Sequence, residues 1–409
     1  MTDLDRWAIT NVRAVGQRRL LDDATVVVAD GRLADLTTGA PAPAGALDGH
    51  GLLLLPGLVD SHSDGLEKEI APRRTASFPI DYALTSFEGK LRAAGVTTVF
   101  HGLPYQNRPG QGRTIEGARQ VQSALAARRN EPTAAVDHRL LYRFEARDEV
   151  ALDPLLEDLA SSDQALDAGP VASDPTAVGG AAPLISYEDH TPGQGQYRDP
   201  AQYAAALDPA NLPPGVTAEE WVAKRMADAE ELAPVRAKNL DRLAPLAHRG
   251  EIRLLAHDLE HPSDVEWAAE AGATVAEFPV TAASARAARQ HDMTVVMGAP
   301  NALRGGSHNA NASARELVTH GLCDVLASDY LPSALLAATF EVAAQGLCSL
   351  PRAVALVTAG PARMAGLTDR GRLEIGAVAD LLLVDDSGRW PQVVASWRAD
   401  DAPAWRILR

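Results

Sequence analysis

Short apolar runs alternate with helical patterns through the middle of the chain. This order of elements is typical of a fold built on a parallel sheet. The runs are nearly continuous rather than alternating, as expected for strands that are buried on both faces. Eight such runs are found, at 52–62, 95–103, 138–146, 182–190, 252–260, 273–281, 293–301 and 323–332. The pattern predicts a (β/α)8, or TIM, barrel over residues 56–362.

Two β-rich segments flank this middle part. Residues 5–55 and the closing segment carry β-branched and apolar runs broken by Gly, Asp and Pro. We expect residues 1–55 and 363–409 to combine into one small β-sandwich domain. Residues 161–182, rich in Ala, Gly, Pro and Asp, predict a loop or flexible insertion. Residues 200–248 predict a helical insertion, which serves either as a lid or as structural packing.

Composition narrows the class of protein. The 409 residues are enough for a barrel of roughly 250 residues plus a second module. The formal net charge of −16 argues against nucleic-acid and membrane-surface partners, which select basic faces. No signal peptide or long apolar run is found, and two cysteines make no disulfide framework. We expect a cytoplasmic protein with a small-molecule substrate, and a homodimer is left open.

The strongest local motif is PGLVDSHSD, residues 56–64, in which an apolar strand runs into His62 and Asp64. Residues two apart on a strand face the same side, so these two side chains can bind one metal ion. Imidazole combined with carboxylate suits zinc, manganese or iron. The alternative is a turn with a surface histidine and a capping aspartate.

Five further strand ends carry residues that can coordinate a metal or ionise, namely Glu145, His190, His257, Glu277 and Asp329. In such barrels the carboxyl ends of the strands carry the chemistry. Glu145 can bridge two metals or pair with a neighbouring arginine, and the two histidines are either ligands or buried core residues. Asp329 can ligate a metal and accept the proton of an attacking water, or it caps the segment after its strand.

The glycine-rich stretch GAPNALRGGSH, residues 298–308, comes after the seventh run. Gly305 and Gly306 let backbone N–H groups approach an anion, while Arg304 and His308 add charge and donors. Lys68, shortly after the first run, is a further candidate anion contact. These five residues form the predicted substrate-binding set, although a glycine-rich stretch can also be a plain turn.

At these residues the sequence resembles the amidohydrolase superfamily, through PGLVDSHSD, the closing ADLLLVD strand and the split β module. It is most similar to the branch of diphosphatases that act on a phosphonate-bearing ribose triphosphate. The shared stretches include HRLLYRFE, DHTPGQ, GAPNALRGGSH and LASDYLPSALL, in order, between about residues 52 and 340. The resemblance implies two divalent metal ions, zinc first and manganese or iron as alternatives. It implies the ligand set His62, Asp64, Glu145, His190, His257 and Asp329.

The chain departs from this branch at several positions. Gly65 stands where asparagine is common and Gly195 where arginine is expected, and Asp258 is followed by Leu-Glu rather than by a second aspartate. These changes remove donors near the predicted pocket. His190 and His257 also fall on the fourth and fifth runs, whereas the superfamily usually has them on strands five and six. Either a strand near 161–182 is missing from the count, or this branch differs.

Three functions are consistent with these observations. The first is hydrolysis of a triphosphate, which releases diphosphate and leaves a 5-phosphate, with Asp329 as the catalytic proton acceptor. The second keeps the metals but cleaves a C–N bond in an N-acyl or cyclic amide substrate. The third is a metal-free binding protein, which predicts missing ligands, whereas all six positions carry residues able to bind metal.

Overall fold

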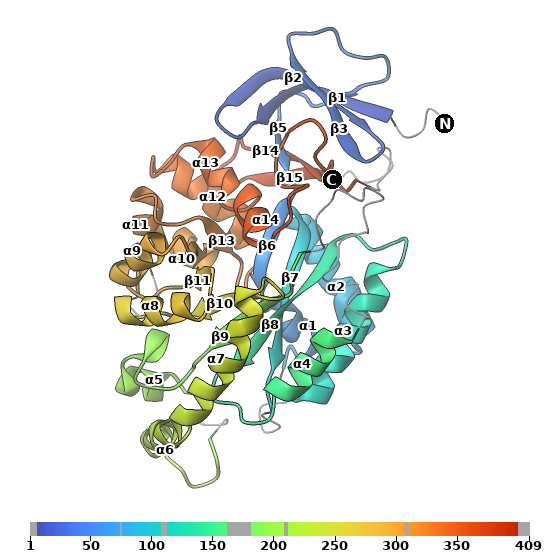
Figure 1. Cartoon of the computed structure of the whole chain (residues 1–409). Helices are drawn as coiled ribbons and strands as arrows, with labels where there is room; N and C mark the ends of the chain where they lie inside the picture. Colours follow the sequence, from blue (N-terminus) through green and yellow to red (C-terminus); the bar gives the residue numbers. More distant parts are fainter. Residues whose placement is uncertain are drawn as a thin grey trace.

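An eight-stranded parallel sheet forms the centre of the molecule in this computed structural model (Figure 1). The structure describes residues 6–73, 76–107, 113–161, 181–207, 212–306 and 311–399. The strands are β6 (Leu58–Ser63), β7 (Val96–Tyr105), β8 (Asp137–Glu145), β9 (Leu184–Glu188), β10 (Arg253–His257), β11 (Val275–Glu277), β12 (Thr294–Gly298) and β13 (Val325–Ala327). A parallel bridge between Ser63 and Asp329 joins the first strand to the last. The predicted barrel is therefore confirmed, with all eight strands where the apolar runs are.

An apolar layer fills the interior of the barrel, with one side chain from each strand. Its members are at most 3% exposed: Val59, Phe100, Leu141, Leu184, Leu255, Val275, Val296 and Val325. Burial of such a side chain stabilises the fold by about 1.5–3 kcal/mol. Polar side chains replace this layer toward the carboxyl ends of the strands, where His62, Glu188 and Glu277 are also buried. The chemistry of the barrel is thereby confined to one end.

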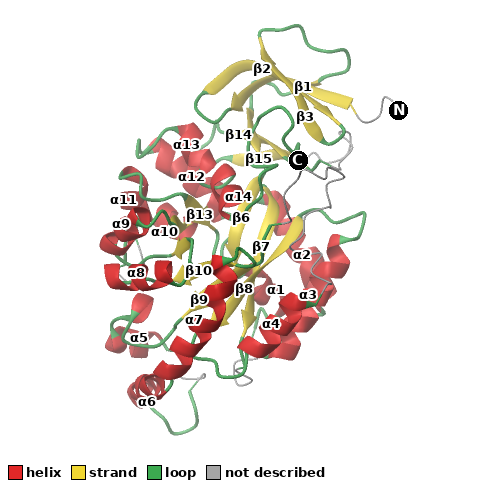
Figure 2. Ribbon diagram, viewed as in Figure 1, coloured by secondary structure: helices red, strands yellow, loops and turns green. Residues whose placement is uncertain are grey.

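Helices surround the strands (Figure 2). Helix α2, for example, buries Ala83, Leu84, Phe87 and Leu91, whose spacing forms one apolar stripe. The helices outside the 200–248 stretch are α1 (Gly65–Ile70), α2 (Ile80–Ala93), α3 (Ile115–Arg129), α4 (Leu152–Ala160), α8 (Pro262–Glu270), α9 (Ala282–Gln290), α10 (Ala299–Arg304), α11 (Ala314–Thr319), α12 (Ala334–Ala344), α13 (Leu350–Ala355) and α14 (Ala359–Met364). None of the helices in the described part of the chain is long and apolar enough to cross a membrane.

Three helices occupy the stretch between residues 200 and 248: α5 (Pro200–Ala206), α6 (Ala218–Glu231) and α7 (Ala233–His248). Thr217 and Glu220 form a reciprocal capping box that fixes the start of α6. Helix α7 packs on the barrel through Leu240 and Leu243, so it is the barrel helix that follows the fourth strand. Helices α5 and α6 lie beyond it, past the carboxyl ends of the strands (Figure 1).

Both ends of the chain contribute to a second sheet of seven strands. The strands are β1 (Arg6–Val15), β2 (Leu20–Ala29), β3 (Arg32–Thr38), β4 (Leu47–Asp48), β5 (Leu53–Pro56), β14 (Leu381–Asp385) and β15 (Gln392–Trp397). The two ends meet where β5 pairs antiparallel with β14. The predicted β module built from both termini is therefore present, as a single sheet. The division at residues 55/56 and 362/363 stays a prediction, and α14 packs Ala362 and Met364 against the interior of the barrel.

The unusual position of the two later histidines is explained by the strand order. Strand β8 pairs directly with β9, and β9 pairs directly with β10, so no strand lies between them in the sheet. His190 therefore comes after the fourth strand and His257 ends the fifth. The loop expected at 161–182 lies almost wholly outside the described residues.

Candidate metal centre

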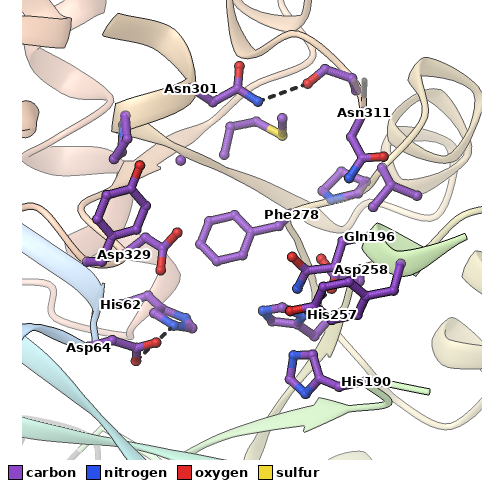
Figure 3. A pocket seen from close by; sticks show the side chains of 18 of the residues that line it. His62, Asp64, His190, Gln196, His257, Asp258, Phe278, Asn301, Asn311 and Asp329 are labelled. Atoms are coloured by element: carbon purple, nitrogen blue, oxygen red, sulfur yellow. Dashed lines mark hydrogen bonds and ion pairs between the residues drawn. The ribbon is translucent and has the colours of Figure 1, made fainter. Parts of the chain in front are cut away.

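All six predicted metal ligands line one cavity of about 450 Å³ at the carboxyl ends of the strands. Figure 3 shows His62, Asp64, His190, His257 and Asp329 around it. The ring centroids of His62 and His257 are 6.0 Å apart, and those of His190 and His257 are 5.4 Å apart. Three imidazoles from distant parts of the chain thus meet at one rim of the barrel, as the sequence predicted. Their roles as ligands stay a proposal. Three overlapping groups of side chains in the described residues lie close enough to hold a metal ion; one of them, His62, His257 and Glu277, connects the other two.

The first group is formed by His62, Asp64 and Asp329, whose ligand atoms lie within 4.8 Å of one another. Nε2 of His62 is 3.4 Å from Oδ1 of Asp64. The other ring nitrogen, Nδ1, is 2.8 Å from Oε1 of the buried Glu277. When Nδ1 donates its hydrogen to this carboxylate, the lone pair of Nε2 is left facing Asp64 and Asp329.

The second group is formed by His190, His257 and Asp258, again within 4.8 Å. Glu145 lies beside this group, and both of its carboxylate oxygens contact His190. Oε1 accepts from the backbone N–H of His190 at 3.1 Å, and Oε2 is 3.1 Å from Nδ1 of its ring. Glu145 therefore orients His190 in this structure. Its predicted role as a bridge between two metals stays a prediction.

Several buried polar atoms at this end of the barrel have no hydrogen-bond partner. Within the described residues these include Oδ1 of Asp64 and Oε2 of Glu188, whereas Nδ1 of His257 lies 3.2 Å from Oδ2 of Asp258. A buried polar atom without a partner costs about 1–3 kcal/mol. Divalent cations coordinate imidazole nitrogen and carboxylate oxygen, so these atoms fit a metal centre. The donors are nitrogen and oxygen only, which suits zinc, manganese or iron.

The carboxylates of the site favour positive charge. Burial opposes protonation of His257, but Asp258 and Glu188 outweigh burial and raise the pKa of its imidazole to about 9. Burial likewise opposes protonation of His62, and Glu277 together with Asp64 holds its pKa well above the ordinary value. The same field favours a divalent cation, whose binding requires neutral imidazoles and therefore releases protons.

Arg143, which points inward from β8, places a buried positive charge in the site and is held by two carboxylates. Its Nη1 donates to Oδ2 of Asp64 at 2.5 Å, and its Nε donates to Oε1 of Glu188 at 2.8 Å. Burial opposes ionisation of Asp64, yet Arg143 and His62 hold its pKa well below the usual range. Asp64 thus has one oxygen on Arg143 and the other available for a metal.

Gly102 on β7 leaves the space that Asp64 and Arg143 occupy. A Cβ atom at this position would lie 2.4 Å from Oδ1 of Asp64 and 2.9 Å from Cδ of Arg143. Real Cβ atoms do not approach other atoms so closely, and neither neighbour is free to move away, because Arg143 is buried and bound to Glu188. Glycine is therefore required here for close packing.

Backbone strain also gathers at the site. Asp258, Phe278 and Asp329 have φ values of 56°, 53° and 56°, in the left-handed region that non-glycine residues rarely adopt. They come directly after the fifth, sixth and eighth strands or close to their ends. Phe278 is the most unusual of them, and its ring centroid lies 5.2 Å from that of His62 and 5.3 Å from that of His257. Such strain is typical of functional sites.

The departures from the family pattern have physical explanations in the structure. A Cβ atom on Gly65 would lie 2.4 Å from the ring of Phe87, so the aromatic ring takes the place of a side chain. Gly195 has φ 55°, and its N–H donates to Oε2 of Glu260 at 3.0 Å. A Cβ atom there would lie 3.1 Å from the carbonyl oxygen of Asp258. The changes at 195 and at 258–260 are thus in contact with each other.

The predicted substrate-binding residues are only partly brought together. Arg304 and Gly306 line the cavity, whereas Gly305 packs against Arg315 instead. Lys68 is outside it: its Nζ lies 4.8 Å from the ring centroid of Tyr330, in a neighbouring cavity of about 600 Å³. His308 lies outside the described residues.

Sequence reasoning missed some lining residues. Arg143, Tyr197, Arg225 and Asp258 line the cavity, and Glu277 holds His62. Glu277 ends the sixth apolar run and is among the polar strand ends that the sequence identifies, but the predicted ligand set does not include it. Arg225 belongs to α6, and no local pattern connects this helix to the rim.

Comparisons with known proteins agree with this geometry. A family model described as the amidohydrolase family matches residues 90–396. Over 392 residues the chain is 31% identical to the alpha-D-ribose 1-methylphosphonate 5-triphosphate diphosphatase of Escherichia coli (strain K12), covering 95% of this chain and 98% of that protein.

Solved structures show the same fold at low sequence identity. An enamidase is 14% identical with a TM-score of 0.58, over 97% of this chain and 95% of that one. A dihydropyrimidinase from Brevibacillus agri is 13% identical with a TM-score of 0.55, over 97% and 94%. The family match, the full-length relative and the shared fold together lead to one conclusion: this chain belongs to the amidohydrolase family and is a hydrolase of that superfamily.

Proposed function

We propose that this protein is a metal-dependent hydrolase of phosphoric anhydrides. Its substrate is alpha-D-ribose 1-methylphosphonate 5-triphosphate or a related phosphonate, from which it releases diphosphate. The proposal is carried by one observation: side chains that could hold metal ions share a single cavity with Arg225 and Arg304, which make no ion pair among the described residues. The relative from Escherichia coli, whose name states this activity, supports the choice of substrate.

We assign the ligands to two ions, one for each of the two groups described above, which the group of His62, His257 and Glu277 connects. His62, Asp64 and Asp329 would hold one ion, and His190 and His257 the other, with Glu145 reaching both. Zinc is the first choice, with manganese and iron as alternatives. Bound divalent ions lower the pKa of water from ~15.7 toward roughly 7 and neutralise charge on phosphoryl oxygens.

Asp329 is the residue proposed to accept the proton of the attacking water. Burial raises the pKa of its carboxyl group, which makes the carboxylate a better proton acceptor than an exposed aspartate. Its backbone N–H donates to the carbonyl of His62 at 2.9 Å, and its own carbonyl accepts from Asp64 N–H at 2.6 Å. These bonds hold Asp329 beside the first group of ligands. Arg304, at the rim, would bind phosphate oxygens.

The test is to follow phosphorus directly. Purified protein loaded with zinc or manganese is incubated with the phosphonate triphosphate, and products are identified by ³¹P NMR. Diphosphate and a 5-phosphate in equal amounts are expected. A parallel panel of N-acyl and cyclic amide substrates tests the alternative. Turnover of an amide together with no release of diphosphate would overturn the proposal in favour of C–N cleavage.

A further inference from the structure

We infer that Arg225, on helix α6, binds the end of an anionic chain that extends from the metal centre. The inference rests on the proposed function and names the feature of the substrate that the site selects. Helices α5 and α6 are then part of the binding site rather than a cover. The ligand class is a linear polyphosphate or an ester of one, with charge several atoms away from the bond that is cleaved.

The position of Arg225 on its helix is the first observation. Val222 and Ala229 are the buried residues of α6, three positions before and four positions after Arg225. Residues at this spacing share one face of a helix, so Arg225 lies on the face that packs inward. It lines the metal cavity, together with Tyr203 of α5. A charged side chain on the inward face of a helix does not serve solubility, so the position of Arg225 is consistent with a role in the cavity.

The bonding of Arg225 is the second observation. Among the described residues, its guanidinium makes one hydrogen bond, from Nη2 to the carbonyl of His190 at 3.4 Å, and no ion pair. The neighbouring arginines of the cavity are committed: Arg143 to Asp64 and Glu188, and Arg113 to Glu67 through two bonds of 2.9 Å. Arg225 therefore keeps donors for a ligand. A guanidinium fits phosphate through paired N–H donors.

Arg225 and Arg304, the two cavity arginines without an ion pair among the described residues, come from different parts of the rim. Arg225 contacts the segment after the fourth strand, whereas Arg304 ends α10, after the seventh. The proposed ligands Asp64, Glu145 and Asp329 line the same cavity as the two arginines. A single phosphate group is compact, whereas a chain of phosphates carries charge at several points along its length. Such a chain offers charge to each arginine.

The experiment compares binding of tripolyphosphate and orthophosphate by calorimetry. It uses wild type, Arg225→Met and the matched control Lys224→Met, with protein in the metal-free and the metal-loaded form. Lys224 is on the same helix, 64% exposed and paired with Asp228. Loss of a charge-assisted hydrogen bond predicts that Arg225→Met binds tripolyphosphate about tenfold more weakly or worse. Orthophosphate affinity, metal content and the Lys224→Met variant should stay within about twofold of wild type, and Arg225→Lys should recover part of the loss.

Two results would overturn the inference. One is tripolyphosphate affinity of Arg225→Met within about twofold of wild type. The other is an equal loss for orthophosphate together with reduced metal content, which would mean that Arg225 supports His190 rather than a ligand. Failure of the proposed function is a separate result: wild type would cleave no triphosphate, whereas the difference between the two probes would remain.

Discussion

Oε1 of Glu277 lies 2.8 Å from Nδ1 of His62, and both residues are at most 1% exposed. The second carboxylate oxygen of Glu277 accepts from Oγ of Ser186 at 2.6 Å, so the carboxylate is fixed at both ends. Carboxylates in this position set the orientation of a ligating histidine and increase its basicity. Glu277 is thus the positioning residue for the first group of ligands, although it was absent from the ligand set that the sequence predicted.

Replacement of Glu277 tests this role. Glu277→Gln keeps the shape but removes the charge, and a loss of metal affinity of about 10- to 100-fold is expected. Competition with a chromogenic chelator measures it. Glu270→Gln, at the end of α8 and away from the cavity, is the matched control and should bind metal as wild type does. Equal affinity in all three proteins would refute a positioning role for Glu277.

Gly102 gives a test by steric crowding. In Gly102→Ala the added methyl group collides with Asp64 and Arg143, so activity should fall by at least about 100-fold and metal content should drop. Gly89, inside α2, is the control, because a Cβ atom added there would meet no other atom within 4 Å. Gly89→Ala should keep full activity and gain about 0.5–1 kcal/mol of stability. A fully active Gly102→Ala variant would contradict the geometry described for Asp64.

The proposed ligands themselves are tested by removal. His62→Ala and Asp329→Ala should each reduce kcat below detection while circular dichroism shows the fold unchanged, since both side chains lie at the rim and outside the apolar layer. Arg304→Ala should mainly raise KM for a phosphorylated substrate. Activity of either ligand variant within about tenfold of wild type would remove that residue from the centre.

A buried network behind the second strand predicts a dependence of stability on pH. Oε1 of Glu88 is 2.7 Å from Nε2 of His138, whose other nitrogen is 2.8 Å from His101, and Arg128 pairs with the second oxygen of Glu88. Burial opposes ionisation of Glu88, but His138 and Arg128 outweigh it and hold the pKa of Glu88 below its usual 4.5.

The unfolded chain therefore takes up a proton at Glu88 at higher pH than the folded protein does. Stability from this group is complete above about pH 4.5 and is lost as the pH falls through the lower, folded pKa. Urea unfolding between about pH 3 and pH 7 should show a steeper acid loss in wild type than in Glu88→Gln. Parallel curves for the two proteins would contradict this assignment.

The barrel could be predicted because its strands are buried on both faces. Strand β8 illustrates both the strength and the limit of that reasoning, since all nine of its residues are buried. A continuous run identifies the strand, but it does not tell which side chains point inward. Arg143 and Glu145 face the cavity, whereas His138 contacts Glu88 of the surrounding helix α2. The spacing of two between Arg143 and Glu145 became informative only once the barrel was closed.

Lys68 illustrates a different limit. It is only six residues from His62 in sequence. Because Lys68 is part of α1, which begins at Gly65, its side chain lies over the ring of Tyr330 and outside the metal cavity. Arg225 is the reverse case, since it is 35 residues from His190 and still touches its carbonyl oxygen. Contacts made by helices beyond the strand ends depend on tertiary packing, which no local pattern in the sequence records.

The central claim is that two groups of side chains bind metal at this rim of the barrel. Anomalous diffraction from crystals of the zinc-loaded protein, recorded on both sides of the zinc edge, tests it most directly. We expect one peak among His62 Nε2, Asp64 and Asp329, and a second beside His190 and His257. Anomalous density elsewhere, or none in a fully folded protein with these side chains in place, would contradict the claim.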